Sequence, residues 1–429
     1  MIIHYSDNKN TAGIVRHSCG ILFILFSFCY LYFLQGELIS KAQYVFSNGM
    51  TTYSIFWGAL IITVVLRIIQ IPAEKFVTIP LRYYALTYIP SFLVLSVICD
   101  VNHDVFENFS LGWWWLGIPF VLCLFYFLSK FAVLVDTDTK NNQRGYGSIP
   151  YLWPNFIILI IVMVFCGTCH SATDVDMYEQ KIERLLLEKD YDKALNVGLK
   201  SVDSNLRLTN LRMYALSKTG KLPQCLFEYP QYYGLDGLLC VTDTSSHCYR
   251  FDSSDICSYI GVPCDSTIHD SEQYFKKMSI VQLLVSDSIM DIERLKSEHN
   301  DSLDMMTQYR YERLKNRKKI IDDYILCGLL LKRDIDAFKE HLEHSFIDEE
   351  RTDSIVPADS LPKAYREALV MVTPEVCDTA MIKAYGSYLE MKAAHKDSTI
   401  SSNMTRRKYG NTFWWYYYNP SVTHVIHLP

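Results

Sequence analysis

The chain has 429 residues, of which 41 are Lys or Arg and 47 are Asp or Glu, and its formal net charge is −6 at pH 7. The charges are unevenly divided: residues 1–169 contain nine basic and eight acidic residues, whereas residues 170–429 contain 32 and 39. A mildly acidic part with mixed charges lacks the concentrated basic face that nucleic acid binds, so we expect no nucleic-acid partner.

Five stretches of the first part are long and apolar enough to cross a lipid bilayer, which takes about 20 mostly apolar residues in a helix. Arg67 is the one charged residue within them, one turn before the end of the second stretch, where a long side chain can reach the headgroups. No small-residue cleavage site follows the first stretch, so we expect it to be retained rather than removed as a signal peptide. The predicted spans are residues 18–35, 51–71, 83–99, 111–129 and 151–168.

The basic residues predict the orientation of these spans. Eight of the nine basic residues precede the first span or lie in and beside the loops that follow the second and fourth spans, whereas Lys41 alone lies on the other side. Because positively charged loops stay in the cytoplasm, the N-terminus is predicted to be cytoplasmic. Five crossings then carry residues 170–429 to the outside.

The predicted outer loop between the third and fourth spans contains Asp100, His103, Asp104 and Glu107. Spacings of three and four residues place such side chains on one face of a short helix, where His103 and the carboxylates can hold a divalent metal. The carboxylates of Asp100, Asp104 and Glu107 are also candidate catalytic groups. A solvated acidic turn explains the same residues equally well.

The fifth span ends in Cys166-Gly167-Thr168-Cys169-His170. This pattern matches the attachment site of c-type haem and also resembles a dithiol redox motif. The C-terminal end of a helix is its negative end, which raises the pKa of a thiol and disfavours redox reactivity. Haem needs a second axial ligand, and none is evident. The favoured interpretation is an ordinary membrane-exit segment, and we expect no cofactor.

After Asp174 the sequence takes on the period of amphipathic helices, and no strand alternation is present, so we predict an all-α fold. Residues 1–169 form the predicted transmembrane domain and residues 170–429 the predicted soluble domain. The expected soluble helices are residues 177–188, 191–202, 206–219, 272–296, 304–332, 335–343, 362–372 and 378–394.

The helical pattern fades at about residues 222–270, where a Cys-rich loop region is predicted. Cys240, Cys248, Cys257 and Cys264 are candidates for disulfides, which an oxidising compartment permits. The local pairing is Cys240–Cys248 with Cys257–Cys264, but spacing does not decide connectivity. Buried free thiols are the alternative.

One segment repeats: Leu185-Leu186-Leu187-Glu188-Lys189-Asp190-Tyr191-Asp192 recurs as Leu329-Leu330-Leu331-Lys332-Arg333-Asp334-Ile335-Asp336. A polar turn between two helices is the simplest structure for it, and stacked helix pairs build solenoids. With Leu211, Ala215, Leu216 and Gly220-Lys221, the first copy resembles tetratricopeptide repeats.

The whole layout, with the aromatic ending Tyr409–Tyr418, resembles an uncharacterised family of bacterial multi-pass membrane proteins with an extracytoplasmic tetratricopeptide-like region. The resemblance implies a bacterial inner-membrane protein whose C-terminal domain lies in the periplasm, and it implies no known activity.

These features favour a membrane-anchored binding or assembly module with a protein or peptide partner in the periplasm. The alternative is a membrane-embedded enzyme of cell-envelope glycan or lipid metabolism that uses the outer-loop carboxylates. A transporter is disfavoured because the spans hold almost no ionisable residues. Arg313–Lys319, five of whose seven residues are basic, is predicted to be a solvated helix face.

Overall fold

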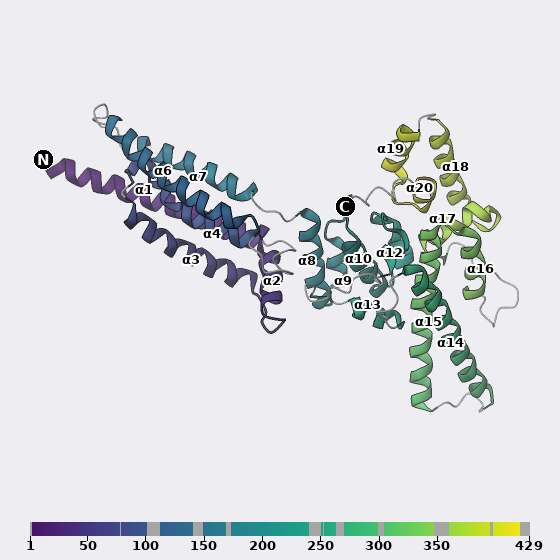
Figure 1. Cartoon of the computed structure of the whole chain (residues 1–429). Helices are drawn as coiled ribbons and strands as arrows, with labels where there is room; N and C mark the ends of the chain where they lie inside the picture. Colours follow the sequence, from purple (N-terminus) through teal and green to yellow (C-terminus); the bar gives the residue numbers. More distant parts are fainter. Residues whose placement is uncertain are drawn as a thin grey trace. The chain divides into compact units, whose positions relative to one another are not determined.

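The computed structural model describes residues 2–77, 79–100, 112–139, 149–168, 173–239, 250–251, 253–262, 270–298, 304–346, 360–394 and 398–420. The regular elements in these ranges are all helices, which confirms the all-α prediction (Figure 1). The chain divides into two compact units. The membrane unit comprises Met1–Gln180 with His247–Arg250, and the C-terminal unit comprises Lys181–Ser246 with Phe251–Pro429.

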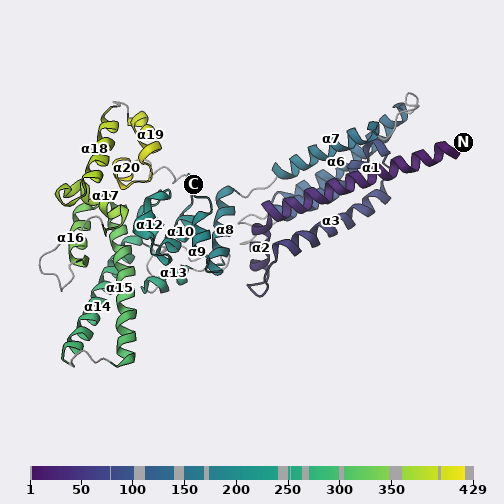
Figure 2. The same ribbon diagram turned by 180° about the vertical axis from the view of Figure 1, so that it is seen from behind.

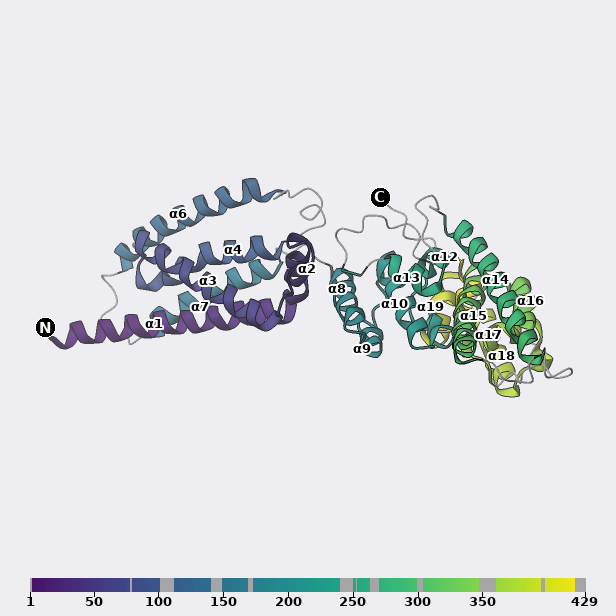
Figure 3. The same ribbon diagram turned by 90° about the horizontal axis from the view of Figure 1, so that it is seen from below.

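The membrane unit is a helical bundle. Among the described residues, five segments are long and apolar enough to cross a membrane: Asn10–Leu34, Ile55–Phe76, Leu81–Cys99, Trp114–Val135 and Ile149–Thr168. Helices α1, α3, α4, α6 and α7 run alongside one another (Figures 1 and 3). The elements are α1 (Ile2–Cys29), η1 (Tyr30–Leu34), α2 (Gly36–Phe46), α3 (Ile55–Phe76), η2 (Leu81–Tyr88), α4 (Ile89–Cys99), α6 (Trp114–Thr139) and α7 (Ile149–Thr168).

Helix α3 extends beyond the predicted end of the second span. It continues through Pro72 to Phe76, and membrane helices tolerate an internal proline where other groups of the protein satisfy the freed carbonyl. Arg67 therefore lies nine residues, about 13 Å, before the end of the helix. The prediction that Arg67 sits one turn from the span's end is wrong.

The third span is predicted to be one continuous α-helix. In the structure it is a 3₁₀ segment, η2, followed by α4. Pro90 stands in the first turn of α4, where a proline is tolerated, and its missing N–H cannot continue the hydrogen bonding of the preceding turn. Tyr83 departs from helical geometry within η2. Backbone groups freed in this way need partners, since lipid offers none.

The fully buried Asn155 of α7 supplies those partners. Its Oδ1 accepts a hydrogen bond from the backbone N–H of Ala85 at 2.6 Å. Its Nδ2 donates to the carbonyl of Leu81 at 3.0 Å and to the carbonyl of Tyr151 at 2.7 Å. One amide therefore joins the irregular third span to the fifth.

We expect Asn155→Leu to destabilise the membrane unit by about 2–4 kcal/mol, because the backbone groups of η2 lose their partners in an apolar surrounding. The thermal unfolding midpoint of the full chain in detergent measures the effect. Ile157→Leu, at an exposed position of the same helix, is the control and should leave the midpoint unchanged. An unchanged midpoint for Asn155→Leu would contradict the role of this amide.

The C-terminal unit begins within α8, and its long antiparallel hairpin, α14 with α15, extends beyond the other helices of the unit (Figures 1 and 2). Its elements are α8 (Asp174–Leu187), α9 (Tyr191–Asn196), α10 (Leu206–Lys218), α11 (Leu222–Cys225), η3 (Leu226–Glu228), α12 (Gly234–Leu238), α13 (Ser253–Ile260), α14 (Ser271–Glu298), α15 (Met305–Lys332), α16 (Ile335–Phe346), α17 (Lys363–Val372), η6 (Pro374–Val376), α18 (Thr379–Ala393), α19 (Ser398–Tyr409) and α20 (Phe413–Tyr418).

Several predicted boundaries in this unit need correction. The predicted helix 191–202 ends at Asn196. The predicted loop region 222–270 contains the short helices α11, η3, α12 and α13. Helices of one or two turns show no readable period and are stable only through tertiary packing, so the sequence pattern misses them.

Both copies of the repeated segment form the same turn between two helices. Lys189 and Arg333, at equivalent positions, adopt left-handed φ angles of 60° and 61°. The N–H of Lys189 donates to the Leu186 carbonyl, and the next N–H donates to the Leu185 carbonyl, as in a Schellman motif. The second copy has the same bonds. The N–H of Arg333 donates to the carbonyl of Leu330, and the N–H of Asp334 donates to the carbonyl of Leu329.

The aspartate of each copy then begins the next helix. Asp190 Oδ1 accepts from the N–H of Lys193, and Asp334 Oδ1 accepts from the N–H of Ala337. Four residues after each aspartate, Ala194 and Phe338 are buried. The repeated sequence thus encodes a repeated structural turn.

Lys189 and Arg333 differ in what the side chain contributes. Arg333 donates from Nε and Nη2 to the carbonyl of Tyr416 at 3.3 and 3.2 Å, and its guanidinium lies 4.4 Å from the centre of the Tyr416 ring. A left-handed φ is strained for both residues and free of strain for glycine.

We therefore expect Lys189→Gly to stabilise the fold by about 0.5–1 kcal/mol and Arg333→Gly to destabilise it by about 1–2 kcal/mol. Chemical denaturation of the full chain, followed through the C-terminal unit, measures both variants. Shifts of the same sign and size would show that the Arg333 side chain contributes nothing beyond its backbone geometry.

Candidate functional site

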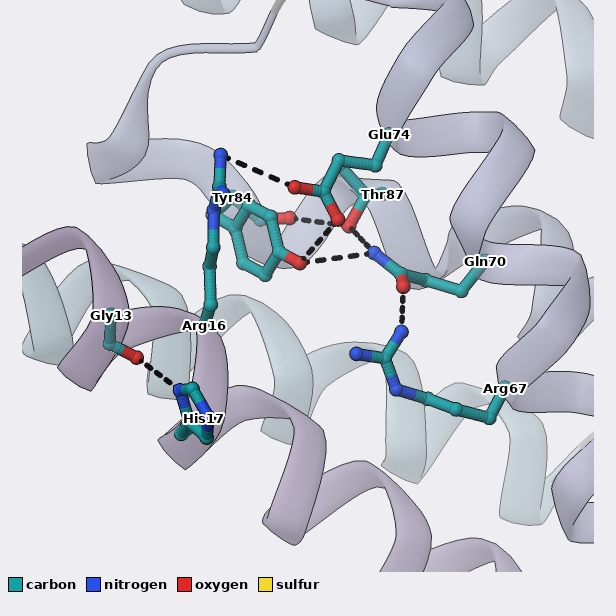
Figure 4. Close-up of polar contacts among 8 residues, drawn as sticks. All are labelled: Gly13, Arg16, His17, Arg67, Gln70, Glu74, Tyr84 and Thr87. Carbon is teal, nitrogen blue, oxygen red and sulfur yellow. Dashed lines mark hydrogen bonds and ion pairs between the residues drawn. The ribbon is translucent and has the colours of Figure 1, made fainter.

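A polar network lies within the spans of the membrane unit. Arg67, Gln70 and Glu74 are spaced three and four residues apart, so they share one face of α3. This face is directed toward Tyr84 and Thr87 of η2 (Figure 4). Polar and ionisable side chains cost free energy inside a bilayer, so they are expected either to hold helices together or to take part in function.

Hydrogen bonds join these side chains in a chain. Glu74 Oε2 accepts from the Tyr84 hydroxyl at 2.8 Å. Gln70 Nε2 donates to the Tyr84 hydroxyl at 3.2 Å and to Thr87 Oγ1 at 2.8 Å. Gln70 Oε1 accepts from Arg67 Nη1. The fully buried Gln70 amide therefore connects the carboxyl end of the network to its guanidinium end.

Helix α1 contributes a basic side chain at the Glu74 end of the network. Arg16 Nη2 lies 3.2 Å from Glu74 Oε1, and its guanidinium is 5.7 Å from the centre of the Tyr84 ring. The Arg16 side chain is 55% exposed. His17, one residue on, bonds to the Gly13 carbonyl of its own helix (Figure 4). At the other end, Arg67 lies 5.8 Å from the centre of the Tyr88 ring.

This network corrects the expectation that the spans hold almost no ionisable residues. Glu74 was missed because the second span was predicted to end at residue 71, before the continuation of α3 through Pro72. The period of Arg67, Gln70 and Glu74 along the sequence is the feature that identifies the polar face. Chemically, the network fastens α3 to η2 and α1.

We expect Gln70→Met to lower the unfolding midpoint of the membrane unit more than the double substitution Arg67→Met/Gln70→Met does. A guanidinium that loses its partner inside a bundle costs more than the removal of both partners. Unfolding of the full chain in detergent, compared across the two single variants and the double variant, tests this. A double variant with a lower midpoint than Gln70→Met would contradict it.

The predicted outer-loop candidates are only partly described. Asp100 ends α4, and its Oδ2 accepts a hydrogen bond from Trp114 Nε1 at 2.7 Å, so this carboxylate joins the end of α4 to the start of α6. His103, Asp104 and Glu107 lie outside the described residues. Within the described ranges, no three His, Cys, Asp or Glu side chains come together to hold a metal ion.

Cys166, the first cysteine of the Cys-x-x-Cys-His pattern, faces the interior of the bundle. It is buried, and its Sγ accepts a hydrogen bond from Ser96 Oγ of α4 at 3.4 Å. Its carbonyl accepts from the Tyr30 hydroxyl at 3.5 Å. Cys169 and His170 lie outside the described residues. The described part of the pattern therefore contributes to the packing of α4 on α7.

Of the four disulfide candidates, Cys257 is described and is disulfide-bonded. It lies on α13 and is buried. Cys240, Cys248 and Cys264 are outside the described residues, so the pairing stays a prediction. Cys225, at the end of α11, is a free thiol.

The aromatic ending forms a core around a buried carboxyl group. Glu367 of α17 accepts from the N–H of Phe413 at 2.7 Å, and its carbonyl accepts from Trp414 Nε1 at 2.7 Å. Burial raises the pKa of Glu367 to about 7. Phe413, Trp414 and Tyr416 are themselves buried, so α20 is packed into the unit rather than displayed on it.

The exposed face of α14 carries several large apolar side chains. Ile280, Leu283 and Leu284 share a face and are 58%, 64% and 60% exposed. Further exposed apolar residues continue toward the tip of the α14–α15 hairpin: Met290, Leu295, Met305, Met306 and Tyr309. A helix normally keeps apolar residues on the side that packs, so a second apolar face marks an interaction surface.

Comparison with known proteins gives one match. Residues 244–419, less than half of the chain, match a family of unknown function, DUF6057. This region includes α13 to α20 and the second copy of the repeated turn, and none of the candidate spans. No curated protein and no solved structure matches the chain.

Proposed function

We propose that the chain is a membrane-anchored binding module whose partner is a protein that docks on the exposed face of α14. The observation that carries this proposal is the two-sided character of the helix. One side, with Tyr274, Met278 and Ile289, is buried, and α15 is the helix that packs most extensively along α14. The other side presents Ile280, Leu283 and Leu284 to solvent.

The charges on this face indicate the chemistry of the partner. Asp287 and Asp291 are exposed and continue the face of Ile280 and Leu284 along the helix. A partner surface with apolar side chains flanked by Lys or Arg would complement it, since charge complementarity sets register and specificity at such contacts.

The C-terminal unit is proposed to lie outside the cytoplasm, in the periplasm of a bacterial cell, with the five spans in the inner membrane. The asymmetry of basic residues between alternate loops supports this orientation. The disulfide at Cys257 also supports it, because such bonds persist in oxidising compartments.

A tetratricopeptide-like origin of the helix pairs α8–α9 and α15–α16 belongs to the same proposal. Its support is the shared turn, with a left-handed Lys189 or Arg333 followed by an aspartate that caps the next helix. The alternative enzymatic function rests on Asp100, Asp104 and Glu107. Asp100 is hydrogen-bonded to Trp114, and no described contact gives it a catalytic arrangement.

A photo-crosslinking amino acid placed at Leu283 of the full chain in its native membrane tests the docking face. We expect a single heterologous adduct that is lost when Asp287 and Asp291 are both replaced by Lys. Glu390, an exposed position on α18, is the control and should give no adduct.

An adduct with the mass of two copies of the chain would overturn the proposal of a different protein partner. So would equal labelling from Glu390, or an adduct that persists after the charge reversal. Crosslinking to lipid alone would identify the face as a membrane contact instead.

A further inference from the structure

The C-terminal unit contains a cavity of about 900 Å³ between α13 and α15. Its polar lining comes from Ser254 and Ser258 of α13 and from Arg310, Arg313 and Arg317 of α15. Leu314 and Ile320 give it an apolar wall. Its volume is in the range of sites that hold small organic ligands.

The three arginines share one face of α15. Their spacings of three and four residues place them in a row about 10 Å long along the helix axis. The basic run Arg313–Lys319, predicted to be a uniformly solvated face, is therefore divided. The exposed Arg313 and the half-buried Arg317 line the cavity, whereas Lys315 and Lys319 are exposed elsewhere on the helix.

Arg317 is held in place by the end of α13. Its Nη2 donates to the carbonyl of Gly261. Gly261 has a φ of +82°, which favours glycine, and a Cβ at this position would clash with the Arg317 guanidinium. This contact fixes one guanidinium at the cavity wall before any ligand arrives, which lowers the entropic cost of binding.

The cationic groups have unused hydrogen-bonding capacity. In the described parts of the chain, neither Arg310 nor Arg313 forms an ion pair, and Arg317 Nε is buried without an acceptor. The hydroxyl group of Ser258 adds a donor on the opposite wall. Three guanidinium groups around one cavity repel one another unless an anion neutralises them.

We propose that this cavity binds an organic diphosphate. Two N–H groups of one guanidinium can donate parallel hydrogen bonds to two oxygens of a phosphate. Two adjacent phosphoryl groups supply the charge and the length for a row of three arginines, which a single carboxylate does not. Leu314 and Ile320 would contact the organic part. The site is separate from the docking face on α14, so either can exist without the other.

Such a diphosphate can be a soluble metabolite or the headgroup of a membrane lipid, and both present the same chemistry to the arginines. Two probes separate these sources. Inorganic pyrophosphate represents the free anion, and a lipid diphosphate with a short, water-soluble isoprenoid chain represents the headgroup with its adjoining apolar part.

Isothermal titration of each probe into the full chain in phosphatidylcholine nanodiscs tests the proposal. We expect saturable binding that weakens by about tenfold or more in Arg313→Gln, since a charge-assisted hydrogen bond is worth about 1.5–3 kcal/mol. Arg310→Gln, which breaks no described contact, gives an independent second variant. Lys315→Gln on the same helix is the matched control and should bind as the wild type does.

Tighter binding of the isoprenoid probe than of pyrophosphate supports a lipid source, and equal binding supports a free diphosphate. Failure of both probes to bind would overturn the proposal. Equal loss of affinity in Lys315→Gln and Arg313→Gln would also overturn it, because it would reduce the site to the general charge of α15.

Discussion

The membrane unit depends on one constraint: inside a bilayer every backbone polar group needs a partner within the protein. The third span departs from helical geometry at Tyr83, and the Asn155 amide of α7 bonds the N–H of Ala85 and the carbonyl of Leu81 on either side of this residue. The irregular segment in turn presents Tyr84 and Thr87 to Gln70 of α3. The polar network therefore depends on the irregular backbone of the third span, whose free backbone groups are hydrogen-bonded by the fifth span.

The C-terminal unit uses a different device, because water can satisfy its exposed backbone. Two of its connections are tight turns in which Lys189 and Arg333 adopt left-handed geometry and an aspartate begins the next helix. The turns pack helices into a unit whose exposed surfaces carry the two proposed binding features, the apolar face of α14 and the arginine-lined cavity beside α13. The spans anchor this unit, and the proposed binding belongs to the unit itself.

Sequence pattern predicts what depends on composition and period. The five apolar stretches and the all-α class follow from it, and so do the ends of the long helices α14 and α15 to within two residues. Sequence pattern does not predict features that depend on tertiary contacts. These are the continuation of α3 beyond Pro72, the hydrogen bonds of Asn155 to η2, and the short helices between residues 222 and 260. Arg313 and Lys315 look alike in sequence, and only the position of α13 separates a cavity wall from a solvated surface.

In the proposed orientation, five spans hold the C-terminal unit outside the cytoplasm. Protease added to sealed right-side-out membrane vesicles tests it directly, with an epitope tag at each end of the full chain. The account predicts that the C-terminal tag is removed in intact vesicles while the N-terminal tag persists until the vesicles are permeabilised. Loss of the N-terminal tag with protection of the C-terminal tag would contradict it.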